Sequence, residues 1–339
     1  MEYMVSTENK NKRIIDLFAG IGGIRTGFVD AGFSSVFSSE FEAYCQKVYF
    51  DNYNEMPFGD ITKIDEKDIP KFEVLTGGFP CQPFSISGHQ KGFDDTRGTL
   101  FFDVLRIVKY HMPEVVFLEN VKHLVHHDHG NTLKVIITHL EELGYKVSWK
   151  VLNAVNFGSA QNRERIIIIA NKNKIFNFDE VETTPSKRIK DILSKDEDFE
   201  FLQPDEYTIL DKDLWKKQKS GLIFVGYRNK SQRVNGVRPG TLHLSRVHKQ
   251  PNRIYSVLGT HPTLPSQESS GRFWILLEDG RVRKLTLKEC YRLQGYSDNF
   301  KIDPNKSHAY LQVGNSVFVP MMRALAKAVN KQFFETESV

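Results

Sequence analysis

The sequence predicts an α/β protein with a doubly wound, mostly parallel sheet and a second, smaller domain. Short apolar runs alternate with helical patterns through the first half of the chain, which is typical of parallel sheets. A glycine-rich turn, DLFAGIGG at residues 16–23, joins the first apolar run to the first helical pattern. The composition changes after about residue 177, first to an acidic and then to a basic segment, which indicates a second region with a different character.

Each predicted strand is a short apolar run bounded by turn residues. The strands are expected at residues 13–18, 35–39, 72–76, 115–118, 146–152 and 165–170. The helices are expected at residues 24–31, 42–49, 99–110 and 132–143, with two more near the end at 286–293 and 320–333.

Length and composition narrow the class of protein. The 339 residues have room for one large domain or for a large and a small one. The three cysteines, at positions 45, 81 and 290, form no CxxC pair, so we expect neither structural disulfides nor a zinc finger. No apolar run is long enough for a membrane helix or a signal peptide, so a cytoplasmic location and no membrane partner are expected.

A modest net charge of +4 hides an uneven distribution. Residues 179–213 contain twelve Asp or Glu, whereas residues 214–267 contain ten Lys or Arg and no acid. Histidines and aromatic residues are interleaved with these cations. This pattern favours a nucleic-acid partner; the alternative is a solvated basic surface.

The glycine turn indicates a nucleoside cofactor. Its glycines let the backbone turn tightly and approach a ligand closely. Glu40 ends the next strand and can accept both hydroxyls of a ribose, and Asp60 can accept from an adenine amino group. The spacing is not GxGxxG and no phosphate-binding lysine follows, which favours S-adenosylmethionine over NAD. The alternative is a plain turn with ordinary strand-end polarity.

Cys81 raises the question of chemistry, since it could be a core thiol, a metal ligand or a nucleophile. It follows a predicted strand through GGFP, and ligands of doubly wound sheets bind beyond the carboxyl ends of strands. A polar segment from Ser85 to Thr99 follows and is expected to close over a polyanion. Glu119 ends the neighbouring strand. Arg163 and Arg165 alternate onto one face, unless they form a surface ion pair with Glu164.

These motifs, in this order, resemble the bacterial C5-cytosine DNA methyltransferases of the HhaI type, which serve type II restriction–modification systems. The matching pieces are DLFAGIGGIR, Glu40, GDIT, GGFPCQPFSISG, RGTLFFD, ENV, QNRERI, KECYRLQGYSD and GNSV. They cover nearly the whole chain outside residues 190–280. The resemblance implies a Rossmann-like methyltransferase fold with a smaller, mostly β or irregular target-recognition domain.

The resemblance also implies a mechanism. Carbon 5 of cytosine is a poor nucleophile, and a thiolate that adds to C6 makes it enamine-like. Cys81 would be this thiolate, Glu119 would hold N3 and the exocyclic amine, and Arg165 would clamp the carbonyl with Arg163 nearby. The target base is stacked in a duplex and must be flipped out. The sequence does not identify the group that accepts the C5 proton; a water is one candidate.

Further site residues follow from the same resemblance. S-adenosyl-L-methionine would be bound by Phe18, Gly20, Gly22, Gly23, Glu40, Asp60, Ile61, Pro80, Leu100, Asn315 and Ser316. Double-stranded DNA would be contacted by Ser85, Ser87, Arg97, Thr99, Arg228, Arg233, Arg238, Arg246 and Arg253. Arginine, asparagine and glutamine are suited to reading base edges, and the composition favours a GC-rich palindrome such as GGNCC or GGWCC.

The expected domains are a catalytic, cofactor-binding domain at 1–190 completed by 315–339, target recognition at 191–285, and a connecting segment at 286–314. We expect a monomer, and a cognate restriction endonuclease that shares the DNA site without necessarily binding this chain. The HLVHHDHGN segment at 123–131 favours a loop near DNA phosphate over a metal site, and no metal is expected. The alternatives are a tRNA methyltransferase, a non-catalytic DNA-binding regulator and a nicotinamide dehydrogenase.

Overall fold

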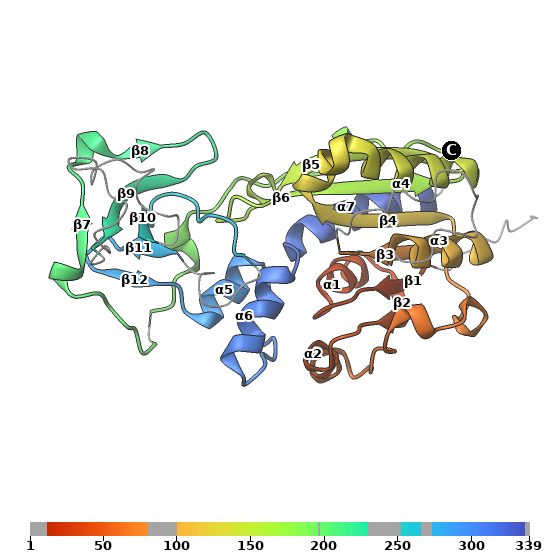
Figure 1. The fold of residues 1–339 in the computed structure, drawn as a ribbon, viewed down its shortest axis with the longest axis horizontal. Coiled ribbons are helices and arrows are strands. Elements are labelled where there is room, and N and C mark those ends of the chain that lie inside the picture. The colour runs from red at the N-terminus through yellow and green to blue at the C-terminus, as the bar shows by residue number, and fades with distance from the viewer. Residues whose placement is uncertain (1–11, 81–99, 196, 230–251, 266–272, 336–339) are drawn as a thin grey trace, which may run out of the picture. The chain divides into compact units, whose positions relative to one another are not determined.

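The computed structural model describes residues 12–80, 100–195, 197–229, 252–265 and 273–335 (Figure 1). The chain divides into two compact units. Unit 1 contains Met1–Leu152, Arg165–Glu182 and Met321–Val339, and unit 2 contains Asn153–Glu164 and Thr183–Pro320.

Unit 1 contains a six-stranded sheet in the order β2-β1-β3-β4-β6-β5. The strands are β1 (Arg13–Leu17), β2 (Ser34–Ser39), β3 (Val74–Gly77), β4 (Val115–Val121), β5 (Lys146–Asn153) and β6 (Glu164–Asn171). The pairs β1–β2, β1–β3 and β3–β4 are parallel, and β4–β6 is antiparallel. The predicted, mostly parallel sheet is therefore confirmed.

Helices cover both faces of this sheet, because alternate strand residues point to opposite sides. On one face, Leu75 and Val116 belong to the same apolar cluster as Val104 of α3 (Leu100–His111) and Ile136 of α4 (Asn131–Glu142). On the other face, Phe28 of α1 (Gly23–Val29) contacts Phe117 edge-on, with ring centroids 5.1 Å apart. This second layer includes the C-terminal helix α7 (Val319–Val329), since a Cβ on Gly27 would lie 2.6 Å from Met322.

The ends of several elements differ from the predictions. Phe18 was predicted inside the first strand, but it has a left-handed backbone with φ of 56° and belongs to the glycine turn. The helix predicted at 42–49 is α2 (Ala43–Tyr53), which is one turn longer. The strand predicted at 115–118 continues through Val121, because β6 pairs with it along its full length. Helix α7 ends earlier than predicted, and a π-helical turn (Asn330–Phe334) follows it.

Unit 2 contains a second six-stranded sheet in the order β12-β11-β10-β9-β7, with β8 paired to β9. The strands are β7 (Tyr207–Ile209), β8 (Lys216–Lys217), β9 (Ile223–Arg228), β10 (Arg253–Ser256), β11 (Trp274–Leu276) and β12 (Val282–Lys284). Two helices, α5 (Leu287–Leu293) and α6 (Lys306–Asn315), follow the sheet. The prediction of a smaller domain with a mostly β or irregular structure is confirmed for this sheet.

Across the described ranges, no helix combines the length and the apolar character needed to cross a membrane.

Candidate active site

The turn after β1 depends on two glycines for different reasons. Gly20 and Gly22 have φ of 55° and 80°, which L side chains rarely adopt. A Cβ on Gly22 would lie 2.3 Å from the Tyr53 ring, whereas a Cβ on Gly20 would meet no described atom within 4 Å apart from its chain neighbours. Gly22 is therefore required by packing, and no described side chain fills the space beside Gly20.

Glu40 fastens this turn to the end of β2. Its Oε2 accepts a hydrogen bond from the Gly20 amide at 2.7 Å, and its Oε1 accepts one from the Glu42 amide at 2.8 Å. The side chain is 9% exposed, and burial raises the pKa of its carboxyl group. The predicted ribose-binding carboxylate thus lies directly against the glycine turn.

A polar network that the sequence analysis missed lies beneath the turn. The Tyr53 hydroxyl donates to the Gly22 carbonyl at 3.0 Å, and its ring lies 4.4 Å from the Arg25 guanidinium. Arg25 pairs with Glu55 at 2.8 Å. Asp16 is fully buried and accepts from the Thr76 hydroxyl at 2.8 Å, and burial raises its pKa to about 7. An aspartate within an apolar strand is the one sequence signal that could have pointed to this network.

The other predicted cofactor residues of unit 1 lie between strands or at the start of a helix. Asp60 caps a 3₁₀ turn by accepting from the Thr62 amide at 3.0 Å. It also accepts from the Thr62 hydroxyl at 2.8 Å, and this second hydrogen bond lowers the pKa of Asp60. The Ile61 carbonyl accepts from Arg106 at 2.5 Å. Pro80 is exposed, and Leu100 begins α3. Phe41, which follows Glu40 in the chain, is 69% exposed.

Glu119 and Arg165 form a buried ion pair on adjacent strands. Arg165 Nε lies 2.9 Å from Glu119 Oε1, and the two side chains are 11% and 10% exposed. Burial lowers the pKa of Arg165, and the carboxylate partner opposes that shift. The other carboxylate oxygen, Oε2, faces Gly78, where a Cβ would lie 3.3 Å away.

The segment that leads to Cys81 is anchored beside this pair. Asn120 of β4 donates to the Phe79 carbonyl at 2.7 Å. Cys81 itself lies outside the described residues. The structure therefore shows a buried carboxylate and a guanidinium at the start of the segment that carries the predicted nucleophile.

Three residues predicted for the cofactor or catalytic group, Asn315, Ser316 and Arg163, belong to unit 2. Asn315 is exposed at the end of α6, and Ser316 Oγ lies 2.6 Å from the Tyr296 hydroxyl. Arg163 is fully buried, so the alternative of a surface ion pair with Glu164 is wrong for this residue. Its guanidinium donates to the carbonyls of Leu264 and Gly314 at 3.1 and 2.9 Å.

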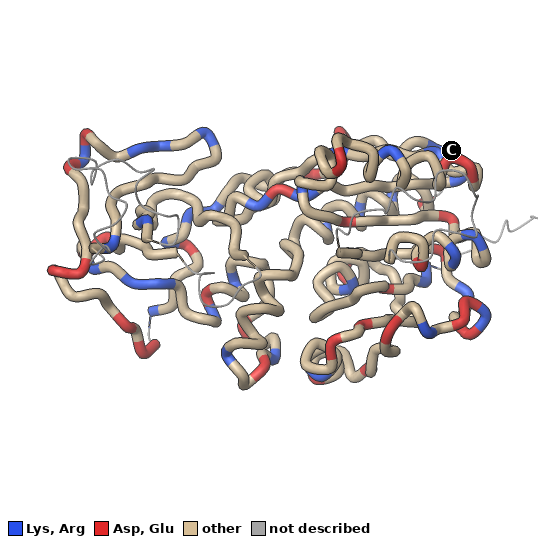
Figure 2. The backbone as a smooth tube through the Cα atoms, in the orientation of Figure 1, with Lys and Arg blue, Asp and Glu red and all other residues tan. Residues whose placement is uncertain are grey.

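Most of the predicted DNA contacts lie outside the described residues, namely Ser85, Ser87, Arg97, Thr99, Arg233, Arg238 and Arg246. Arg228 is described at the end of β9, where it lies 3.3 Å from Glu206 and over the Trp274 ring. Arg253 is half-buried on β10, opposite Tyr227. Two exposed lysines form β8, visible as a blue stretch in Figure 2.

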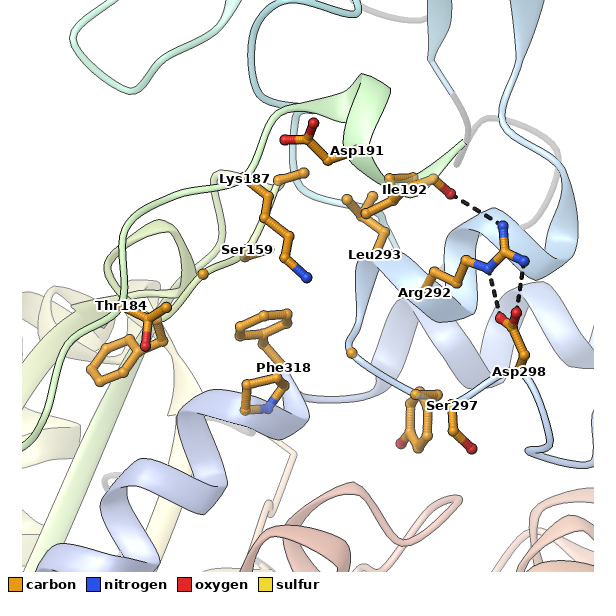
Figure 3. Close-up of a pocket in the computed structure, with 16 residues that line it drawn as sticks. Ser159, Thr184, Lys187, Asp191, Ile192, Arg292, Leu293, Ser297, Asp298 and Phe318 are labelled. Carbon is orange, nitrogen blue, oxygen red and sulfur yellow. Dashed lines mark hydrogen bonds and ion pairs between the residues drawn. The ribbon is translucent and has the colours of Figure 1, made fainter. Parts of the chain in front are cut away.

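Unit 2 also contains a pocket of about 470 Å³ (Figure 3). The Lys187 side chain extends toward Phe318 inside it, and Arg292 is held at its rim by Asp298 with a 2.6 Å contact. The described residues that line the pocket include none of the predicted site residues.

The histidine segment after β4 forms two 3₁₀ turns, Lys122–Val125 and His127–Gly130. His127 Nδ1 lies 2.7 Å from the Thr132 hydroxyl, and Asp128 and His129 have left-handed backbones. Among residues with described positions, no three His, Cys, Asp or Glu side chains gather as a metal site would require.

Comparison with known proteins gives a consistent result. A family model described as C-5 cytosine-specific DNA methylase matches residues 12–331. The chain is 43% identical over 326 residues to the type II methyltransferase M.HhaI of Haemophilus parahaemolyticus, covering 93% of each chain. It is 42% identical over 334 residues to M.SsoII of Shigella sonnei, covering 96% of this chain and 81% of that one. In fold it is similar to the S. pombe Dnmt2 methyltransferase, with a TM-score of 0.68 at 19% identity over 94% and 98% of the two chains.

Proposed function

The chain belongs to the C-5 cytosine-specific DNA methylase family and is a DNA (cytosine-5)-methyltransferase, and from this premise we propose which residues perform the reaction. The buried Glu119–Arg165 pair at the start of the segment that carries Cys81 is the observation that supports this assignment most directly. Such a pair would supply an acid and a fixed cation, and a flipped cytosine would need both.

Cys81 adds as a thiolate to C6 of the cytosine, and the electron pair of the C5–C6 double bond moves toward C5. Glu119 holds the exocyclic amine and keeps a proton on N3, and Arg165 donates to the carbonyl oxygen. After methylation, loss of the C5 proton and departure of the Cys81 thiolate restore the double bond. Arg165 also restrains the Glu119 carboxylate, since their contact at 2.9 Å is buried.

S-adenosylmethionine, the methyl donor of this family, supplies an electrophilic methyl group on a sulfonium when it is bound. The described residues fit such a group: a buried carboxylate lies against a glycine turn, and none of the described side chains lies within 4 Å of a Cβ built on Gly20. Glu40 would bind the ribose, and Phe18, Asp60 and Ile61 would contact the adenine. The contacts of Asn315 and Ser316, which belong to unit 2, are carried over from the resemblance.

The biological role that we propose is that of a type II methyltransferase that protects host DNA from a cognate endonuclease. Residues 191–285 would recognise the DNA site, with Arg228 and Arg253 among its contacts. The exposed lysines of β8 support a polyanionic partner for this sheet. We propose that the working form is a monomer.

The test is methyl transfer from labelled S-adenosylmethionine to mixed DNA and RNA, with modified bases mapped by sequencing. Wild type is compared with Cys81→Ser and with Cys45→Ser, a buried cysteine of α2 that serves as the control. Label at C5 of cytosine within one short DNA motif, lost only in Cys81→Ser, is the expected result. Label in Cys81→Ser, or on RNA alone, would contradict the proposal.

A further inference from the structure

Arg163 is a buried cation whose acceptors come from two distant segments. Among the described residues, it is one of the largest fully buried side chains. Its Nη1 donates to the Leu264 carbonyl at 3.1 Å, and its Nη2 donates to the carbonyls of Gly314 and Ser316 at 2.9 and 2.5 Å. A buried guanidinium is costly unless its donors are satisfied, so these contacts hold the three carbonyls in place.

Two of these carbonyls belong to the end of helix α6, which terminates at Asn315. The last carbonyls of a helix lack partners within it and carry a partial negative charge. Arg163 satisfies the Gly314 carbonyl, and Gln294 Nε2 donates to the Val313 carbonyl at 2.9 Å. Arg163 therefore acts as a cationic cap at the negative end of α6.

Arg163 holds the backbone on both sides of Asn315. The carbonyls of Gly314 and Ser316 lie on either side of Asn315, and one guanidinium nitrogen holds both. The Tyr296 hydroxyl contacts the Ser316 side chain at 2.6 Å. The backbone of this turn is thus fixed while the Asn315 side chain stays exposed.

The segment that carries Arg163 is itself anchored. Gln161 is fully buried, and its Oε1 accepts from the Leu264 amide at 2.9 Å. The Asn162 amide donates to the His261 carbonyl at 2.9 Å. The guanidinium therefore projects from a rigid base, which is what a positioning role requires.

We propose that Arg163 is a positioning residue that sets cofactor affinity by fixing the Asn315–Ser316 turn, and that it takes no part in the chemistry. This assigns it a different role from Arg165, although the sequence placed both in the catalytic group. The inference rests on the proposed function, because it assumes that Asn315 and Ser316 contact S-adenosylmethionine.

The first experiment measures the Kd of S-adenosylhomocysteine by calorimetry and the single-turnover methylation rate at saturating cofactor. Arg163→Lys keeps the charge but loses the planar fork, so its Kd should rise about tenfold or more while the saturated rate stays within about threefold. Arg165→Lys is the matched variant and should show the reverse pattern. Either of two other outcomes for Arg163→Lys would contradict the proposal. A fall in the saturated rate would show that Arg163 takes part in the chemistry, and an unchanged Kd would show that it has only a structural role.

A double-mutant cycle tests whether Arg163 acts through Asn315. Asn315→Ala alone should raise the Kd, and adding Arg163→Lys should raise it by less than about threefold more, because the two residues act as one unit. Fully multiplicative effects would contradict the proposal. If Arg163→Lys does not fold, Tyr296→Phe is the second variant, because it removes the 2.6 Å contact with the Ser316 hydroxyl and should raise the Kd at an unchanged saturated rate. An unchanged Kd in Tyr296→Phe would overturn the proposal.

The wild-type protein separates this inference from the proposed function. If wild type binds no S-adenosylhomocysteine, the proposed cofactor is wrong. If wild type binds S-adenosylhomocysteine, and Arg163→Lys and Tyr296→Phe bind it with the same Kd as wild type, only the inference about Arg163 is wrong.

Discussion

Arg165 Nε lies 2.9 Å from Glu119 Oε1 across the antiparallel pair of strands β4 and β6. Both side chains are about nine-tenths buried, so solvent screens their attraction little. A second arginine–glutamate pair of the same unit, Arg13 and Glu73, has a 2.6 Å contact but is 33% and 22% exposed. The two pairs share their chemistry and differ in burial and in position.

Glu119→Gln should lower the single-turnover methylation rate about 10²- to 10⁴-fold, because the amide cannot supply a proton to N3. The Kd of S-adenosylhomocysteine should change little, since the described partner of this carboxylate is Arg165, whereas Glu40 is the carboxylate that accepts from the glycine turn. Rapid-quench measurement at saturating DNA and cofactor gives the rate.

Glu73→Gln is the matched control for Glu119→Gln, because it removes the charge of a pair outside the site. Its rate should stay within about twofold of wild type, since exposed pairs contribute about 1 kcal/mol or less. Equal losses in both variants would show that Glu119 matters for stability only.

Gly22→Ala should cost far more stability than Gly20→Ala. Both glycines have positive φ, which costs an alanine about 1 to 2 kcal/mol. At Gly22 the added Cβ would also lie 2.3 Å from the Tyr53 ring, and overpacking adds about 1 to 3 kcal/mol. Urea unfolding of the two variants measures the difference, and equal losses would refute the packing role of Tyr53.

Asp16 should make unit 1 less stable as the pH rises toward neutrality. Its folded-state pKa is raised from 3.8 to about 7 by burial, so its contribution is complete below about pH 4 and is lost as the pH rises through 7. Between pH 5 and pH 7.5, wild type should lose about 2 kcal/mol more unfolding free energy than Asp16→Asn. Urea unfolding at the two pH values tests this, and parallel losses would show that Asp16 does not titrate in this range.

His261 should make unit 2 less stable as the pH falls, which is the opposite pH dependence to that of Asp16. Burial lowers its pKa from 6.5 to about 4, so the unfolded state binds the proton first as the pH falls. Between pH 7 and pH 4.5, wild type should lose about 2 kcal/mol more unfolding free energy than His261→Asn, whose amide can still donate to the Pro262 carbonyl. A variant that loses stability as steeply as wild type would rule out His261 as the group responsible.

Much of the fold follows from local pattern. The centres of all six strands of unit 1 were predicted correctly, because buried strands are short apolar runs and the helices between them have their own period. The ends were less predictable. β4 continues to Val121 because β6 supplies hydrogen-bond partners opposite it, and no residue of the strand itself encodes that partner.

The candidate site divides in the same way. The sequence by itself determined the family, the glycine turn, the acid at Glu40 and the presence of the ENV and QNRERI motifs, because these depend on residue type and order. Only the tertiary structure decided that Glu119 pairs with Arg165, that Tyr53 lies under Gly22 and that Arg163 caps helix α6. The physical reason is that a buried polar group takes its partners from the residues that the topology brings near. The carbonyls of Leu264 and Gly314, which accept from Arg163, are more than a hundred residues away from it along the chain.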